Sequence, residues 1–430
     1  MLKIQLTALL VLTAFSFSEA GSLTEKLTDL SVKHAFTFSE VSTDTFFTEK
    51  YVLHFTQPLD HDDPGAGSFE QRVFLAHRGY DAAVVFITEG YGADYAGHPR
   101  YINELSGLLA ANQVCVEHRY FGESVPEEMN WKYLTVANAA GDHHHIVETL
   151  KNIYPRNWVS TGISKGGQTA MYHRFHYPTD VTATVGYVCP LNFSVEDKRV
   201  YRFLEKVGDE ETRNKVTDFQ KEILKNKADY LPVFERYANG KNLTYSMGLE
   251  KGFELTVLEY SFAFWQWGTT SAEAIPLSEP DKEKVIAHLD KVVDLKWIST
   301  QGVRENHPFF YQAMTEIGFY GYDVSAFAEW VSYESNPTFE FSMPENTVAE
   351  YSPGPMQKVD MFIRHEASNM IFLYGENDPW SATAVDLTYN SNLLKIVKPG
   401  GSHLTRIGNL PEDQKKQVMD TLKMWLNSSE

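Results

Sequence analysis

Two kinds of hydrophobic pattern alternate along this chain. Short runs of apolar and β-branched residues recur, and segments with a helical spacing of apolar residues lie between them. This alternation is typical of a mainly parallel β-sheet with helices on its faces. A final helix is expected over residues 411–426, because Val418, Leu422 and Trp425 fall on one helical face. The expected strands are residues 51–56, 71–76, 83–88, 113–118, 158–163, 182–188, 370–374 and 393–397.

Residues 191–364 have a different pattern, rich in charge and in helical spacing. The run Ser278 to Asp281 is typical of a capping box with proline in the first turn. A helical stripe of apolar residues follows it: Val285, Ile286, Leu289, Val292 and Val293. We therefore expect a helical cap over residues 191–364, inserted into a sheet domain made of residues 21–190 and 365–430.

The N-terminus has the pattern of an export signal. Lys3 gives a short positive region, residues 6–17 are largely apolar, and Ser18 and Ala20 provide the small residues of a cleavage site. The apolar run is shorter than the roughly 20 residues that a transmembrane helix needs. We interpret residues 1–20 as a signal peptide, and expect a secreted or periplasmic protein without a membrane anchor.

Composition and charge narrow the possible partners. Hydrophobic residues make up 43% and charged residues 22% of the 430 residues, as in folded globular chains. The formal net charge is −19, which would repel a phosphate backbone. Nucleic acid is therefore not an expected partner, and the oligomeric state stays open.

Ser164 stands in a pattern that points to a catalytic nucleophile. Residues 162–166 fit G-x-S-x-G, and they lie between an expected strand and a helical run over residues 168–176. In this context the pattern predicts a nucleophile elbow, the strained strand-to-helix turn of the α/β-hydrolase fold. The glycines remove side chains that would collide in so tight a turn.

A nucleophilic serine needs a base and a carboxylate that orients the base. In the α/β-hydrolase fold these follow the serine in the order acid, then histidine, on loops after later strands. Asp378 follows the expected strand 370–374, and His403 follows the expected strand 393–397. We therefore predict Ser164, Asp378 and His403 as a catalytic triad, with Glu376 as the alternative acid.

An oxyanion hole needs two backbone N–H donors. Lys165, the residue after the nucleophile, is expected to supply one of them. The other is expected from the loop after strand 83–88, at Gly90 or Tyr91. This chemistry requires no cofactor.

Two further groups of side chains resemble other kinds of site. In the usual strand order of this fold, the strands of Cys115 and Cys189 are separated by two others, far beyond disulfide reach, so two free thiols are expected. The side chains of His143, His144 and His145 diverge by about 100° per residue on a helix. They cannot converge on one ion, so we expect a solvated helix face and no metal site.

Four runs resemble the proline-specific serine exopeptidases, the group that includes prolyl carboxypeptidase and dipeptidyl peptidase II. They are residues 117–124 (EHRYFGES), 162–167 (GISKGG), 311–318 (YQAMTEIG) and 378–381 (DPWS). The likeness spans the mature chain and is greater to the secreted bacterial prolyl tri- and tetrapeptidyl aminopeptidases. The cysteine-rich lysosomal members differ from this chain. The resemblance implies peptide substrates, cleavage after a proline near a free N-terminus, and a cap that limits access.

Aromatic and acidic residues are candidates for the substrate pocket. A proline ring fits a flat apolar slot, which Trp265, Trp267 and Trp380 could form. The alternative for Trp265 and Trp267 is packing inside the cap. An aminopeptidase also binds an ammonium group, for which Glu89 and Glu316 are the candidates.

Three other functions are weighed against this one. An esterase or lipase would use the same triad and oxyanion hole. A prolyl carboxypeptidase would need a cation for the substrate carboxylate, and Arg119 and Arg406 lie near the loops of the site. A non-catalytic binding protein is disfavoured by the intact order of serine, aspartate and histidine.

Overall fold

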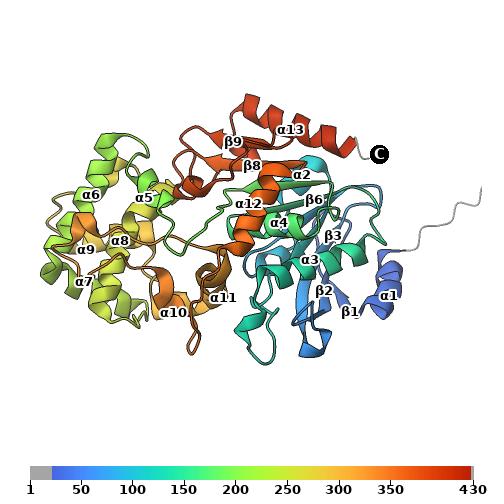
Figure 1. Ribbon diagram of the computed structural model, residues 1–430, viewed down its shortest axis with the longest axis horizontal. Coiled ribbons are helices and arrows are strands. Elements are labelled where there is room, and N and C mark those ends of the chain that lie inside the picture. The colour runs from blue at the N-terminus through green and yellow to red at the C-terminus, as the bar shows by residue number, and fades with distance from the viewer. Residues whose placement is uncertain (1–21, 428–430) are drawn as a thin grey trace, which may run out of the picture.

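A computed structural model describes residues 22–427, and the expected signal peptide lies outside them (Figure 1). One nine-stranded sheet runs through the molecule in the order β1-β2-β3-β5-β4-β6-β7-β8-β9. Neighbouring strands pair antiparallel from β1 through β2 and β3 to β5. From β5 onward, through β4, β6, β7 and β8 to β9, neighbours pair parallel. The strands are β1 (Phe36–Glu40), β2 (Glu49–Pro58), β3 (Ser68–His77), β4 (Val84–Thr88), β5 (Asn112–Val116), β6 (Trp158–Ile163), β7 (Ala183–Tyr187), β8 (Met370–Gly375) and β9 (Leu394–Lys398).

This topology confirms the α/β-hydrolase fold and all eight expected strands. The additional strand, β1, is a short edge strand that pairs only with β2. Its sequence FTFSE alternates for only 5 residues, which gives a weak signal. Cys115 and Cys189 are both buried and free, and β4 and β6 lie between their strands, as expected.

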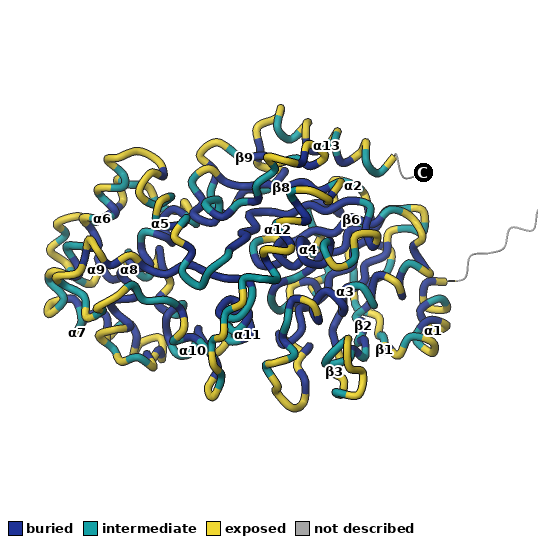
Figure 2. Tube along the Cα trace, in the orientation of Figure 1, coloured by how far each residue is buried: buried dark blue, intermediate teal, exposed yellow. Residues whose placement is uncertain are grey.

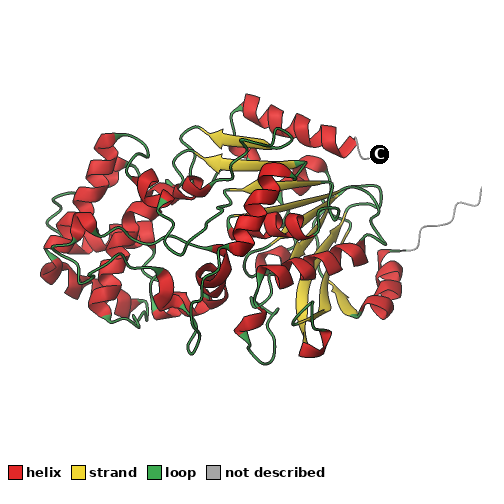
Figure 3. Cartoon of the chain, viewed as in Figure 1, coloured by secondary structure: helices red, strands yellow, loops and turns green. Residues whose placement is uncertain are grey.

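Helices cover both faces of the sheet (Figure 3). In β4, Val84 and Phe86 belong to one core, and Val85 and Ile87 belong to the other, because successive side chains of a strand point to opposite faces. The first core includes side chains from α1 (Leu23–His34) and α3 (Val136–Leu150), and α4 (Lys165–His176) packs beside α3. The second core is closed by α2 (Glu104–Leu109) and α13 (Glu412–Asn427).

A helical segment lies between β7 and β8 and forms the left part of the molecule in Figure 1. Its longest helix is α8, which is buried over most of its length (Figure 2), and the apolar side chains of the segment form one continuous core with α3, α4 and β8 of the sheet domain. The segment contains α5 (Arg199–Leu204), α6 (Glu210–Lys225), α7 (Lys227–Gly240), α8 (Leu249–Trp267), α9 (Lys282–Val293), α10 (Thr300–Glu305) and α11 (His307–Gln312).

Two details of this segment differ from expectation. The apolar stripe of α9 is buried as expected, but the N-cap is Asp281, whose side chain accepts from the N–H of Glu283. Ser278 lies before the helix with a φ of 59°, so it does not form a capping box. The expected cap boundary at residue 364 falls inside α12 (Gly354–His365), and α12 packs against α4 of the sheet domain.

The expected solvated face of three histidines is wrong. In α3, His143 is 1% exposed and its Nδ1 lies 2.5 Å from the carbonyl oxygen of Ala139. His144 pairs with Asp180, and His145 contacts Gln57. His143 is enclosed because α3 packs against α4, which lies directly on the sheet, whereas His144 and His145 are half-buried. Within residues 22–427, no helix is long and apolar enough to cross a bilayer.

Candidate active site

Ser164 lies on a strained turn between β6 and α4. Its φ is 54° and its ψ is −120°, a conformation that a residue with a side chain adopts only where its surroundings fix it. A Cβ on Gly162 would lie 2.1 Å from the carbonyl oxygen of Gly166, and one on Gly166 would lie 2.7 Å from the carbonyl oxygen of Thr88. The pattern G-x-S-x-G therefore forms the elbow geometry that the sequence predicts.

Asp378 and His403 form a buried pair. Asp378 follows β8 and His403 follows β9, and His403 Nδ1 lies 2.7 Å from Asp378 Oδ2. The second carboxylate oxygen of Asp378 accepts from the backbone N–H of Trp380 at 3.2 Å. Glu376 is exposed and accepts from the N–H of Gly400 at 2.7 Å, so it does not orient the imidazole.

The loop after β4 lies directly against the start of α4. A Cβ on Gly90 would lie 2.8 Å from the backbone nitrogen of Gly166, so this approach requires glycine. Thr88 Oγ1 donates to the carbonyl oxygen of Gly166 at 3.0 Å and fixes the loop from the other side. Lys165 is the first residue of α4, where backbone N–H groups have no partner within the helix. The elements that carry the expected oxyanion donors are thus in contact.

The side chain of Lys165 connects the start of α4 to the loop after β4. Its ammonium donates to the carbonyl oxygen of Gly90 at 2.8 Å, and the side chain is 2% exposed. Burial lowers the pKa of Lys165 well below its ordinary value, and the nearby Glu89 opposes this shift. The rings of Tyr91 and Phe121 lie 5.8 Å and 5.6 Å from the ammonium nitrogen. Lys165 is therefore a buried clamp between the elbow helix and the loop.

A cavity of about 1060 Å³ joins these groups to the helical segment. The two walls are connected, because the N–H of His403 donates to the carbonyl oxygen of Gln266 at 2.8 Å. The sheet domain contributes Glu89, Tyr91, Ser164, Lys165, Trp380, His403 and Arg406, and the helical segment contributes Glu259, Gln266, Trp267, Phe309, Phe319 and Tyr320. Ser164 and His403 therefore face the same space, which is large enough for several residues of a peptide.

The structure places two of the three candidate tryptophans in the cavity and one outside it. Trp380 and Trp267 line the cavity, and the Trp267 ring meets the imidazole of His403 edge-on, with centroids 5.8 Å apart. Trp265 does not line it: its side chain is 8% exposed and packs against Gly208, where no Cβ would fit. Its assignment to the substrate pocket is therefore wrong, and packing within the cap is its role.

Of the two candidate carboxylates, one lines the cavity and the other does not. Glu89 lines the cavity and accepts a hydrogen bond from Tyr95, and burial raises its pKa to about 7. Glu316 is not among the lining residues. Its carboxylate accepts from the N–H of Val136 at 2.7 Å and so caps the start of α3, where the helix dipole favours a negative charge. Burial raises the pKa of Glu316 to about 7. Glu316 is a structural residue and not a binding residue of this cavity.

Sequence reasoning missed Glu259. It lies in α8, is 3% exposed and lines the cavity. Its carboxylate accepts from the hydroxyl of Tyr322 at 2.6 Å and from that of Tyr320 at 3.0 Å. Burial raises the pKa of Glu259 to about 8, and the two tyrosine hydroxyls partly offset this effect. Glu259 is the one charged residue within residues 255–267 of α8, and this was the available signal.

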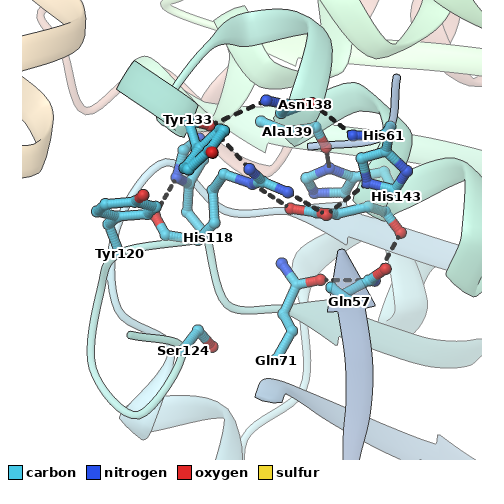
Figure 4. A network of polar contacts seen from close by, with 12 residues as sticks. Gln57, His61, Gln71, His118, Tyr120, Ser124, Tyr133, Asn138, Ala139 and His143 are labelled. Carbon is cyan, nitrogen blue, oxygen red and sulfur yellow. Dashed lines mark hydrogen bonds and ion pairs between the residues drawn. The ribbon is translucent and has the colours of Figure 1, made fainter. Parts of the chain in front are cut away.

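Arg119 is not available to a substrate. It is fully buried and forms two hydrogen bonds of 2.6 Å with Asp142, and Asp142 also contacts His61 at 2.8 Å. Figure 4 shows this network, with Gln57, Gln71 and His143 also drawn. Glu117, at the start of the same run, accepts from the N–H groups of Glu123 and Ser124 and from that of Ala93. The run of residues 117–124 therefore stabilises the backbone of the neighbouring loops and does not bind substrate itself.

Arg406 is the other candidate cation, and it does line the cavity. Its guanidinium donates to the carbonyl oxygens of His403 and Thr405 at 3.1 Å and 2.7 Å. No group of three or more metal-ligating side chains occurs in the part of the chain that the structure describes.

Known proteins resemble this chain over part or most of its length. It is 31% identical to the prolyl tri/tetrapeptidyl aminopeptidase of Streptomyces mobaraensis, over 87% of this chain and 79% of that protein. It is 26% identical to the lysosomal Pro-X carboxypeptidase of Mus musculus, over 43% of this chain and 41% of that one. Among solved structures, a proline iminopeptidase of Mycobacterium smegmatis aligns with 88% of this chain and all of its own, at 13% identity and a TM-score of 0.43.

The sequence profile of PS-10 peptidase S37 matches residues 30–429, nearly the full length. Together with the identity to the Streptomyces relative, this match confirms the resemblance inferred from the four sequence runs. The chain belongs to the peptidase S37 family and is a serine peptidase.

Proposed function

We propose that this protein is an exported serine exopeptidase that removes three or four residues from a peptide's N-terminus, after a proline. The observation that carries the proposal is the common cavity of Ser164 and His403, with His403 paired to the buried Asp378. The name of the Streptomyces relative supports the aminopeptidase activity and the length of the released peptide. The sequence pattern of residues 1–20 supports export to the periplasm or the medium.

The proposed chemistry proceeds through an acyl-enzyme. Ser164 Oγ attacks the carbonyl carbon of the proline, and His403 takes the hydroxyl proton on Nε2, since its Nδ1 faces Asp378. The N–H of Lys165 and that of Gly90 or Tyr91 stabilise the oxyanion. His403 then passes the proton to the leaving amine, the C–N bond breaks, and water hydrolyses the ester by the reverse sequence.

Aromatic rings beside Asp378 support the preference for proline. Trp380, Phe319 and Tyr320 all line the cavity, and the Trp380 ring lies 5.3 Å from each of the other two, centroid to centroid. Flat apolar walls of this kind suit a pyrrolidine ring, which has no side-chain polar group to satisfy. Trp267 contacts the imidazole of His403 edge-on and is proposed to contact the residues around the scissile bond.

A panel of peptides tests the proposal. Each peptide carries one proline at position two, three, four or five, and each is prepared with a free and with an acetylated N-terminus. We expect cleavage after proline at positions three and four, with a strong preference for the free amine. Equal cleavage of acetylated peptides would contradict it. Preference for a free C-terminus would favour a carboxypeptidase with Arg406 as its cation, and hydrolysis of esters alone would favour an esterase.

A further inference from the structure

Glu259 is a buried carboxylate without a cationic partner. No Lys, Arg or His among residues 22–427 forms an ion pair with it, although its neighbour on α8, Glu254, pairs with Lys227 at 2.6 Å. Burying an unpaired carboxylate costs several kcal/mol unless a cation or a proton neutralises it. Burial raises the pKa of Glu259 to about 8, which favours a proton in this role in the free protein. The cavity therefore contains a site where a cationic ligand group would replace that proton.

The two tyrosines hold this carboxylate in one orientation. Tyr320 donates to both of its oxygens at 3.0 Å, and Tyr322 donates to Oε2 at 2.6 Å. The Tyr320 ring is itself fixed, since it stacks on Phe262 with centroids 3.9 Å apart. A carboxylate accepts about four hydrogen bonds, so Oε1 keeps capacity for a further donor. The glutamate is therefore pre-positioned for a ligand.

The position of Glu259 along α8 sets a distance from the reaction centre. Gln266, whose carbonyl oxygen accepts from the N–H of His403, lies seven residues further along the same helix. At 1.5 Å per residue this is about 10.5 Å along the helix axis. An extended peptide covers about 3.3–3.6 Å per residue, so three residues cover about the same distance. Glu89, by contrast, lies directly before Gly90 in the loop after β4, and its carboxylate accepts a hydrogen bond from Tyr95.

We propose that Glu259 binds the α-ammonium group of the substrate and so sets the length of the released peptide. This inference rests on the proposed aminopeptidase function. The ligand is the ammonium group of a peptide three residues upstream of the scissile bond, with Tyr320 and Tyr322 as positioning residues.

The test compares free and acetylated N-termini on one tripeptide with proline in the third position and a chromogenic amide leaving group. The quantity measured is the ratio of kcat/KM for the free peptide to that for the acetylated peptide. We expect Glu259→Gln, which keeps the size and the tyrosine contacts, to lower this ratio about ten- to a hundredfold. Glu316→Gln is the matched control, since it makes the same change at a half-buried carboxylate outside the cavity, and we expect the wild-type ratio.

The outcomes separate the inference from the function on which it rests. A wild-type ratio near one would contradict the aminopeptidase function itself. A high wild-type ratio that persists in Glu259→Gln would leave that function intact and overturn the role of Glu259. If Glu259→Gln fails to fold, Tyr322→Phe provides the second variant, because it removes the 2.6 Å hydrogen bond and leaves the carboxylate in place. We expect it to lower the ratio severalfold, and an unchanged ratio would overturn the inference.

Discussion

The ammonium nitrogen of Lys165 lies 2.8 Å from the carbonyl oxygen of Gly90. This hydrogen bond joins the first residue of the elbow helix to the loop opposite it, and those two elements carry the proposed oxyanion donors. The bond is buried, so water does not compete for either group. The Lys165 side chain therefore helps to set the spacing between the two donors, together with the hydrogen bond from Thr88 to Gly166.

Replacing Lys165 with methionine tests this clamp. We expect kcat to fall about tenfold or more for peptides and for small activated esters alike, since both form an oxyanion. KM should change little, because the contact does not involve the peptide chain. Steady-state kinetics on both substrates provide the measurement, with Lys416→Met on the exposed face of α13 as the control for charge. An unchanged kcat would show that the loop holds its position without Lys165.

Replacing Ser164 with alanine should abolish hydrolysis while the protein stays folded. Loss of a triad nucleophile lowers kcat by a factor on the order of 10⁶. Mass spectrometry after treatment with a fluorophosphonate should find the label on Ser164 in the wild type and on no residue in the variant. Label on another serine would rule out the assignment.

Asp378 and Glu376 offer a matched pair, because they are two residues apart and only one of them contacts His403. Asp378→Asn leaves the shape of the site but favours the wrong tautomer of the histidine, so kcat should fall about 10⁴-fold. Glu376→Gln should keep near wild-type kcat, since its carboxylate contacts the backbone of Gly400. Comparable losses in both variants would contradict the assignment of the acid.

The sequence predicts the parts of this site that depend on local pattern and on chain order. The elbow is a contiguous run, and Asp378 and His403 follow strands that apolar runs make visible. Trp265 and Trp267 show what the sequence alone does not predict. Two residues on a helix differ by about 200° in direction, so only one can face the cavity, and the sequence does not say which one. Glu259 depends on contacts with residues about 60 positions away, which no local pattern reveals.

The two tryptophans near the end of α8 should therefore respond differently to alanine substitution. Trp267 is 40% exposed and lines the cavity, so Trp267→Ala should raise KM for peptides severalfold and leave the stability near that of the wild type. Trp265 is packed in the helical segment, so Trp265→Ala should lower the free energy of unfolding by about 3–5 kcal/mol. Peptide kinetics and chemical denaturation of both variants distinguish the two roles. If Trp265→Ala raised KM and Trp267→Ala lowered the free energy of unfolding, the two assigned roles would be contradicted.

Glu259 should also leave a signature in the dependence of stability on pH. Burial raises the pKa of its carboxyl from 4.5 to about 8, so between these values the folded state holds a proton that the unfolded state has lost. The contribution of this residue to the free energy of unfolding therefore falls as pH rises, by at most about 1.4 kcal/mol per pH unit. The groups bonded to it, Tyr320 and Tyr322, do not titrate in this range, because burial and the carboxylate raise their own pKa values.

The glutamine variant has no proton to lose at this position. Urea denaturation of wild type and Glu259→Gln from pH 5 to pH 8 should therefore give curves that diverge, with the variant gaining relative stability as pH rises. Above pH 8 the difference should become constant, since both states of the wild type are then deprotonated. Addition of the tripeptide product at pH 8 should stabilise the wild type more than the variant, because its ammonium group neutralises the carboxylate. Parallel curves across this range would show that Glu259 keeps an ordinary carboxyl pKa and has no need of a cationic ligand.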